Sequence, residues 1–180
     1  MEKYITEQIP TFINAGHIKV QERLRHFDKT EKFAVITTEG DRLPYISLVA
    51  FALTSNMKGV VFTSKKTTRQ FRNILTDNYV AILIDNRSVC NDCMNIEAIS
   101  IVGTANAVMR GKKWLELSNI LIAKHPSLAD FIHDPTTSLI YVKMITCIPV
   151  NNIQTVSQSN TQMGDSPPSI NDYVDKVISD

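Results

Sequence analysis

The order of hydrophobic and polar positions along the 180-residue chain predicts short strands interrupted by helices. Apolar residues at helical spacing form two N-terminal groups: Ile5, Ile9, Phe12 and Ile13, then Val20, Leu24 and Phe27. They predict two short helices, the first ending near Gly16.

β-Branched and apolar runs then follow one another, separated by turn residues. The predicted strands cover residues 33–38, 43–53, 60–63, 80–84, 98–109, 139–145 and 148–156. Helices are expected over residues 68–75, with Phe71, Ile74 and Leu75 inward, and over residues 112–124. A short turn is expected over residues 127–132. The pattern therefore predicts an α+β, mainly β fold: a six- to seven-stranded antiparallel barrel with flanking helices.

The composition changes at Ser157, where SQSNTQMGDSPPS is typical of a linker. Beyond it, apolar residues at helical spacing predict an amphipathic helix: Ile170, Tyr173, Val174, Val177 and Ile178. We therefore divide the chain into a barrel domain, residues 1–157, and a linker with a C-terminal helix, residues 158–180. A helix this short needs a surface to pack on, and the alternative is a frayed tail.

Composition excludes several classes of protein. Hydrophobic residues make up 43% of the chain and charged residues 21%, as in a folded globular protein. The net charge of +1 argues against a general nucleic-acid binder. The absence of a long apolar run argues against a membrane span, and the charged N-terminus argues against a signal peptide. We therefore expect a cytoplasmic location, and three cysteines make no disulfide framework.

The segment from Thr63 to Asn73, TSKKTTRQFRN, joins a predicted strand to a predicted helix and carries four cations. The N-terminus of a helix is itself partly positive, so cations there are unfavourable unless an anion binds. Hydroxyl groups add short donors for phosphate oxygens. The segment therefore indicates a phosphate site, and the alternative is a solvated basic loop with an ordinary threonine cap. No P-loop or Gly-x-Gly-x-x-Gly motif is present.

Four consecutive motifs give the sequence a recognisable order: RLPYISLVAFAL, GVVFTSKKTTRQFRNIL, VAILIDNR and AISIVGTANAV. Together with LIYVKMITCIPVNNIQTV they resemble the pyridoxamine 5'-phosphate oxidase-like FMN-binding split barrels, over about residues 8–157. The resemblance implies a split β-barrel and a homodimer with two FMN sites at the subunit interface.

The resemblance also assigns residues to the FMN site. The strand around Ile46, Ser47, Leu48 and Val49 would run along the isoalloxazine ring and bond its edge through backbone groups. Thr63 and Ser64 would lie beside the ribityl chain and phosphate.

Thr68, Arg69 and Gln70 correspond to a Thr-Arg-Lys triplet that holds the phosphate in this family. Gln70 stands where lysine is usual, and Lys65 or Lys66 would then compensate for the missing charge. Asn86 and Arg87 are expected near the cofactor of the partner subunit.

The expected function is that of an FMN-dependent oxidoreductase acting on a small redox substrate that the sequence does not identify. Counterparts of the late Arg and Tyr residues that read the vitamin B6 phosphate are absent, which disfavours that substrate. The alternatives are a non-catalytic flavin carrier or sensor, or a barrel that binds deazaflavin or heme.

Other motifs favour structural roles. Cys90 and Cys93 have the spacing of a redox dithiol or half a zinc site, but no second pair exists, and we predict no metal site. Asp130 and Asp134 flank His133, and we interpret this segment as a surface turn. We interpret Trp114 as a residue of the core or of an interface.

Overall fold

The computed structural model describes residues 17–88, 90, 95–151 and 155–156. The helices are α1 (His17–Thr30), α2 (Arg69–Thr76), α3 (Lys112–Lys124), the 3-10 turn η2 (Pro126–Leu128) and α4 (Ala129–His133). The strands are β1 (Phe33–Gly40), β2 (Leu43–Leu53), β3 (Gly59–Lys65), β4 (Tyr79–Asp85), β5 (Glu97–Ala107), β6 (Thr137–Asn151) and β7 (Thr155–Val156). None of the helices in these ranges is long and apolar enough to cross a membrane.

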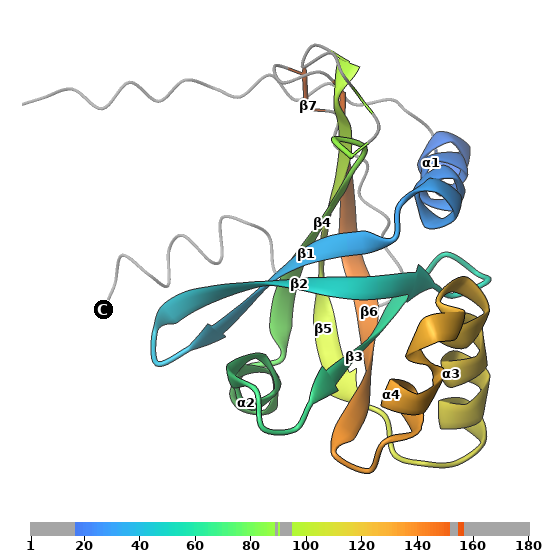
Figure 1. Ribbon diagram of the computed structural model, residues 1–180. Helices are drawn as coiled ribbons and strands as arrows, with labels where there is room; N and C mark the ends of the chain where they lie inside the picture. The colour runs from blue at the N-terminus through green and yellow to red at the C-terminus, as the bar shows by residue number, and fades with distance from the viewer. Residues whose placement is uncertain (1–16, 89, 91–94, 152–154, 157–180) are drawn as a thin grey trace, which may run out of the picture.

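Six strands form a closed antiparallel barrel. They hydrogen-bond in the order β3-β2-β1-β4-β5-β6, and β6 pairs with β3 to close the ring. β7 adds a short pairing to the far end of β6. The helices lie around this barrel (Figure 1), so the predicted fold class is confirmed.

Alternating residues of the strands fill the barrel. Ile36, Phe62, Ile82 and Ile101 are almost fully buried and belong to one core cluster. Phe27 of α1 packs into the same cluster, as does Ile74 of α2. Burial of each such side chain contributes about 1.5–3 kcal/mol, which explains why the strand alternation is so regular.

The outer surface of the barrel has a covered part and an open part. α3 and α4 lie beside β3 and β6 (Figure 1), where Trp114, Leu121 and Ile132 pack on Val61 and Leu139. No helix in the described ranges covers the outward side of β1, β4 and the first half of β2. The apolar residues there are Phe33, Val35, Ile46, Leu48 and Leu83; together with Val102 of the neighbouring strand β5 they form what we call the open sheet face.

Several sequence-based boundaries were wrong. Residues 139–156 were expected as two strands, but β6 runs unbroken through Asn151 because a register shift opposite Val102 and Gly103 absorbs one extra residue. Residues 127–132 form η2 and most of α4 instead of a plain turn. Leu75 was expected inward but is 64% exposed. The helix before Gly16, the linker and the C-terminal helix lie outside the described residues.

Candidate functional site

The β3–α2 junction is held by hydroxyl groups. Thr68 precedes the first residue of α2, and its Oγ1 accepts a hydrogen bond from the backbone N–H of Phe71 at 3.2 Å. The same hydroxyl donates to the carbonyl of Lys65 at 2.8 Å and lies 2.9 Å from Ser64 Oγ. The loop between strand and helix is therefore fixed at both ends, and Thr68 is the N-cap of α2, a feature of the alternative interpretation of this segment.

Helix α2 is attached to the barrel through Asn73. This side chain is 6% exposed, and its Nδ2 donates to Thr38 Oγ1 of β1 at 3.1 Å. A Cβ placed on Gly40 would overlap Asn73 Oδ1, so glycine at this position lets the helix approach β1 closely. Neither Thr38 nor Asn73 was singled out from the sequence, because both look like ordinary polar surface residues there.

Two buried polar atoms, one on α2 and one on β2, lack partners. Gln70 is 7% exposed; its Oε1 accepts from Ser64 Oγ at 3.1 Å. Its Nε2 is buried and has no hydrogen-bond partner within the described part of the chain, and the same holds for Ser47 Oγ on β2. An unsatisfied buried donor costs about 1–3 kcal/mol, so a ligand that accepts hydrogen bonds would stabilise this region.

The cations of the segment point in different directions. The Arg69 guanidinium lies 5.2 Å from the ring centroid of Tyr45, which places it against the first half of β2. Lys66 Nζ instead donates to the carbonyl of Pro135 at 2.8 Å. Lys65 Nζ lies 5.9 Å from the ring of Phe131 in α4. Arg69 is therefore the cation best placed for an anion at the start of α2.

The first half of β2 has one free edge. Residues 43–50 pair with β1, whereas β3 pairs only with residues 51–53. Ile46 and Leu48 point outward and are 67% and 65% exposed, whereas Val49 is buried. Among the described strands none pairs with this edge, so its backbone N–H and C=O groups are available to a ligand.

Asn86 and Arg87 lie away from the β3–α2 junction within one chain. They follow the end of β4 that lies near the start of β1, whereas α2 contacts the other end of β1 through Asn73. Asn86 Oδ1 accepts from the backbone of Glu97 at 2.9 Å, and Arg87 Nε lies 3.1 Å from Asp85. The structure therefore brings Ser64, Thr68 and Gln70 together and places Arg69 against Tyr45 of β2, without Asn86 and Arg87.

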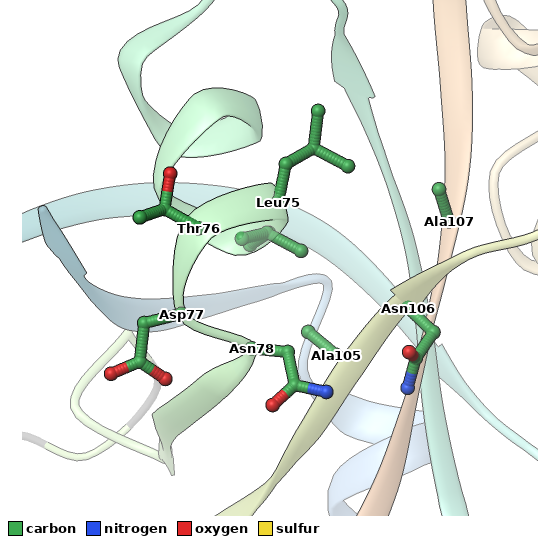
Figure 2. A pocket seen from close by; sticks show the side chains of 8 residues that line it. Leu75, Thr76, Asp77, Asn78, Ala105, Asn106 and Ala107 are labelled. Carbon is green, nitrogen blue, oxygen red and sulfur yellow. The ribbon is translucent and has the colours of Figure 1, made fainter.

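A hollow of about 390 Å³ lies at the other end of α2 (Figure 2). It is lined by Asp77, Asn78 and Asn106 together with Leu75 and small residues of β5. Helix C-termini carry partial negative charge, and Asp77 adds a carboxylate, so this hollow disfavours anions. A phosphate would therefore choose the opposite end of the helix.

The remaining candidates show structural contacts. Burial raises the pKa of the Cys147 thiol to about 12, which makes it unreactive. Trp114 is 7% exposed in the core under α3, as predicted. His133 Nδ1 lies 2.8 Å from the carbonyl of Ala129 on an exposed turn. No group of three metal-ligating side chains occurs among the described residues, a range that excludes Cys93.

The chain belongs to the pyridoxamine 5'-phosphate oxidase family, whose profile matches residues 20–146. This match covers the barrel from α1 to β6 and confirms the resemblance read from the motifs. A comparison with curated protein sequences found no match.

Solved structures with the same fold bind different cofactors. A heme-binding protein from Mycobacterium smegmatis superposes with a TM-score of 0.70 at 15% identity, over 78% of this chain and 57% of that one. HutZ, a heme storage protein from Vibrio cholerae, superposes with a TM-score of 0.64 at 13% identity, over 76% of this chain and 99% of that one. An FAD-binding protein from Mesorhizobium loti superposes with a TM-score of 0.57 at 7% identity, over 73% of this chain and 91% of that one. At such identities the likeness shows the fold alone.

Proposed function

We propose that the protein binds FMN and works as an FMN-dependent oxidoreductase. The observation that carries the proposal is the polar cluster at the start of α2, made of Ser64, Thr68 and Gln70, where Gln70 Nε2 is buried without a partner in the described chain. Arg69 of the same helix lies over Tyr45, in the part of β2 that has a free edge.

The polar cluster fits a phosphate. Arg69 would supply the charge that the usual lysine supplies in this family, because Gln70 offers only a neutral N–H donor. The hydroxyl protons of Ser64 and Thr68 are directed to Gln70 Oε1 and to the carbonyl of Lys65, so both hydroxyls would have to rotate in order to donate to a phosphate. Lys65 is exposed and would add long-range attraction, whereas Lys66 is engaged with Pro135.

The free edge of β2 fits the ring of a flavin. The backbone N–H groups of residues 45–50 that face away from β1 would donate to the ring edge and would favour negative charge on it. Bound FMN would supply the hydride or electron chemistry, so the protein needs no strong acid or base of its own. This agrees with the absence of an obvious catalytic residue at the described junction.

The test is titration of flavin-free protein with FMN and with riboflavin, which lacks the phosphate. We expect Arg69→Ala to weaken FMN binding by about 1.5–3 kcal/mol, a factor of about 10–150, and to leave riboflavin binding unchanged. Arg72→Ala is the matched control, because Arg72 is an exposed cation one turn further along α2. Equal FMN affinity in wild type and Arg69→Ala would remove the junction from the site.

Two rival functions have separate readouts. A non-catalytic flavin carrier would bind FMN but would show no oxidation of reduced nicotinamide. Heme binding is favoured by the named functions of two structural relatives, and a Soret band in the purified protein would reveal it. In the described chain His125 Nε2 is buried against the carbonyl of Phe51 at 2.8 Å, so it is a poor heme ligand.

The open sheet face supports the homodimer that the resemblance implies. One row of paired residues crosses four strands, through Ile46, Thr37, Ala81 and Val102. A second row crosses three strands, through Leu48, Val35 and Leu83. A continuous apolar face of this kind marks an interface, and a two-fold dimer is the commonest way to cover it.

We expect light scattering to report twice the 20.2 kDa chain mass. Ile46→Asp should shift the protein to monomer, because it places a charge on the open sheet face. Leu115→Asp is the control, since Leu115 is 55% exposed but lies on α3. A wild-type monomer that still holds FMN would contradict the dimer.

A further inference from the structure

The amide of Gln70 and the two hydroxyls beside it form a network that needs no ligand, apart from one donor. Ser64 Oγ donates to Gln70 Oε1 at 3.1 Å, and Thr68 Oγ1 donates to the carbonyl of Lys65 at 2.8 Å. The Thr68 hydroxyl also accepts from the backbone N–H of Phe71. Within the described chain, Gln70 Nε2 is the buried donor left over. A phosphate at this junction would therefore gain one unused buried donor and would have to compete for the hydroxyls.

The positive charge at the junction is small for a phosphate monoester, which carries about 1.5–2 negative charges at pH 7. Lys66 Nζ donates to a backbone carbonyl of the loop after α4. Lys65 interacts electrostatically with the carboxylate of Asp134. Arg69 would therefore balance about one charge of the phosphate, and Gln70 adds none.

The start of α2 is open to water on one side. Thr67 and Arg69 are exposed there, whereas Gln70 and Ser64 are buried. Phosphate charge that the protein does not balance would stay hydrated on the open side, because transferring it from water without a partner is costly. Such a phosphate is held less firmly than one between two fixed cations, and the difference is expected mostly in the dissociation rate.

We propose that FMN is an exchangeable substrate of this protein, which enters and leaves with each reaction, instead of a permanently bound cofactor. Gln70 is the residue that sets this property, since it supplies shape and one donor but no charge. A lysine at this position would pair with the phosphate, but without phosphate it would be a buried unpaired charge. The inference rests on the proposed function and specifies how that site treats its ligand.

The wild-type protein gives the first test, which does not depend on how any variant folds. After loading with excess FMN, the protein should lose the flavin during gel filtration. Retention of one FMN per chain through gel filtration and dialysis would overturn the proposal and leave the proposed function intact. Failure to bind either FMN or riboflavin in titrations would instead remove the proposed function, and this proposal with it.

Substitutions at position 70 give the second test, read by flavin fluorescence during titration. Gln70→Lys should tighten FMN binding about tenfold or more and leave riboflavin binding unchanged, because the added charge meets the phosphate. Gln70→Met, neutral and similar in length, should weaken FMN binding by a factor of about 2–10 through loss of the Nε2 donor.

Thr76→Lys is the matched control, because it places the same charge at the exposed far end of α2 and should leave FMN affinity unchanged. Folded Gln70→Lys protein that binds FMN no more tightly than wild type would overturn the proposal. Equal tightening by Thr76→Lys would overturn it as well, because position 70 would then have no special role.

Discussion

Gly40→Ala tests how α2 is held on the barrel. The new methyl group would overlap Asn73 Oδ1, and Asn73 is fixed by its bond to Thr38 and by burial. The backbone at Gly40 does not require glycine, because positive φ occurs in the next two residues, Asp41 (57°) and Arg42 (59°). The effect of the substitution would therefore come from packing.

The expected magnitude combines three contributions. Overpacking costs about 1–3 kcal/mol, and a weakened bond between Asn73 and Thr38 costs about 0.5–1.5 kcal/mol. Alanine also restricts the unfolded chain more than glycine does, which offsets about 0.4–1 kcal/mol of this loss. We expect Gly40→Ala to lower the free energy of unfolding by about 0.5–4 kcal/mol.

A double-mutant cycle isolates the contact. Asn73→Ala alone should cost about 1–3 kcal/mol, because Thr38 Oγ1 keeps only the 3.5 Å contact with the carbonyl of Tyr45. In the double variant the overlap is gone, so the combined loss should be about 1–2 kcal/mol smaller than the sum. Urea unfolding at equilibrium measures all four free energies.

Asn119→Ala, an exposed position on α3, replaces Asn73→Ala in the control cycle and should be additive with Gly40→Ala. Additivity of Gly40→Ala with Asn73→Ala would refute the reasoning.

Two further predictions concern the thiols and the C-terminus. Burial raises the pKa of Cys147 to about 12, so the thiol should resist alkylation at pH 8 in the folded protein and react in urea. The thiol of the unfolded chain ionises first, near its ordinary pKa of 9.0. The contribution of Cys147 to stability should therefore fall as the pH rises from about 9 to about 12. Rapid labelling of Cys147 in native protein, read by mass spectrometry, would show that the barrel opens there. Truncation after Ser157 should lower the melting temperature if the predicted helix over residues 170–178 docks, and an unchanged melting temperature and FMN affinity would refute docking.

The barrel was predictable because its strands alternate or are buried on both faces. Ile82 and Ile84 alternate with exposed residues in β4, and the pattern that predicted them depends only on the side-chain period of two. The long β6 was not predictable, because Ile145 is absorbed by a register shift that depends on the partner strand. Leu75 was placed inward by its spacing, but Asn73, a polar residue, takes the buried position since Thr38 can bond it.

The site was predictable only as a segment. Hydroxyls and cations between Thr63 and Gln70 indicated where an anion would bind, but the direction of each side chain depends on tertiary neighbours. Arg69 packs over the ring of Tyr45, whereas Lys66 donates to the carbonyl of Pro135 and so points away from the start of α2.

The pairing of β3 with β6 has a consequence for how the chain folds. Strand β3, residues 59–65, cannot complete its pairing until residues 137–143 of β6 are present. By contrast, β1 and β2 are joined by a two-residue turn and can pair at once. Closing the long loop between these two strands costs conformational entropy before the strands make any stabilising contact, so such long-range pairing slows folding. On the ribosome the hairpin of β1 and β2 can therefore form early, while the ring stays open until most of the chain has emerged. Until then the free edge of β3 is exposed to pairing with other chains.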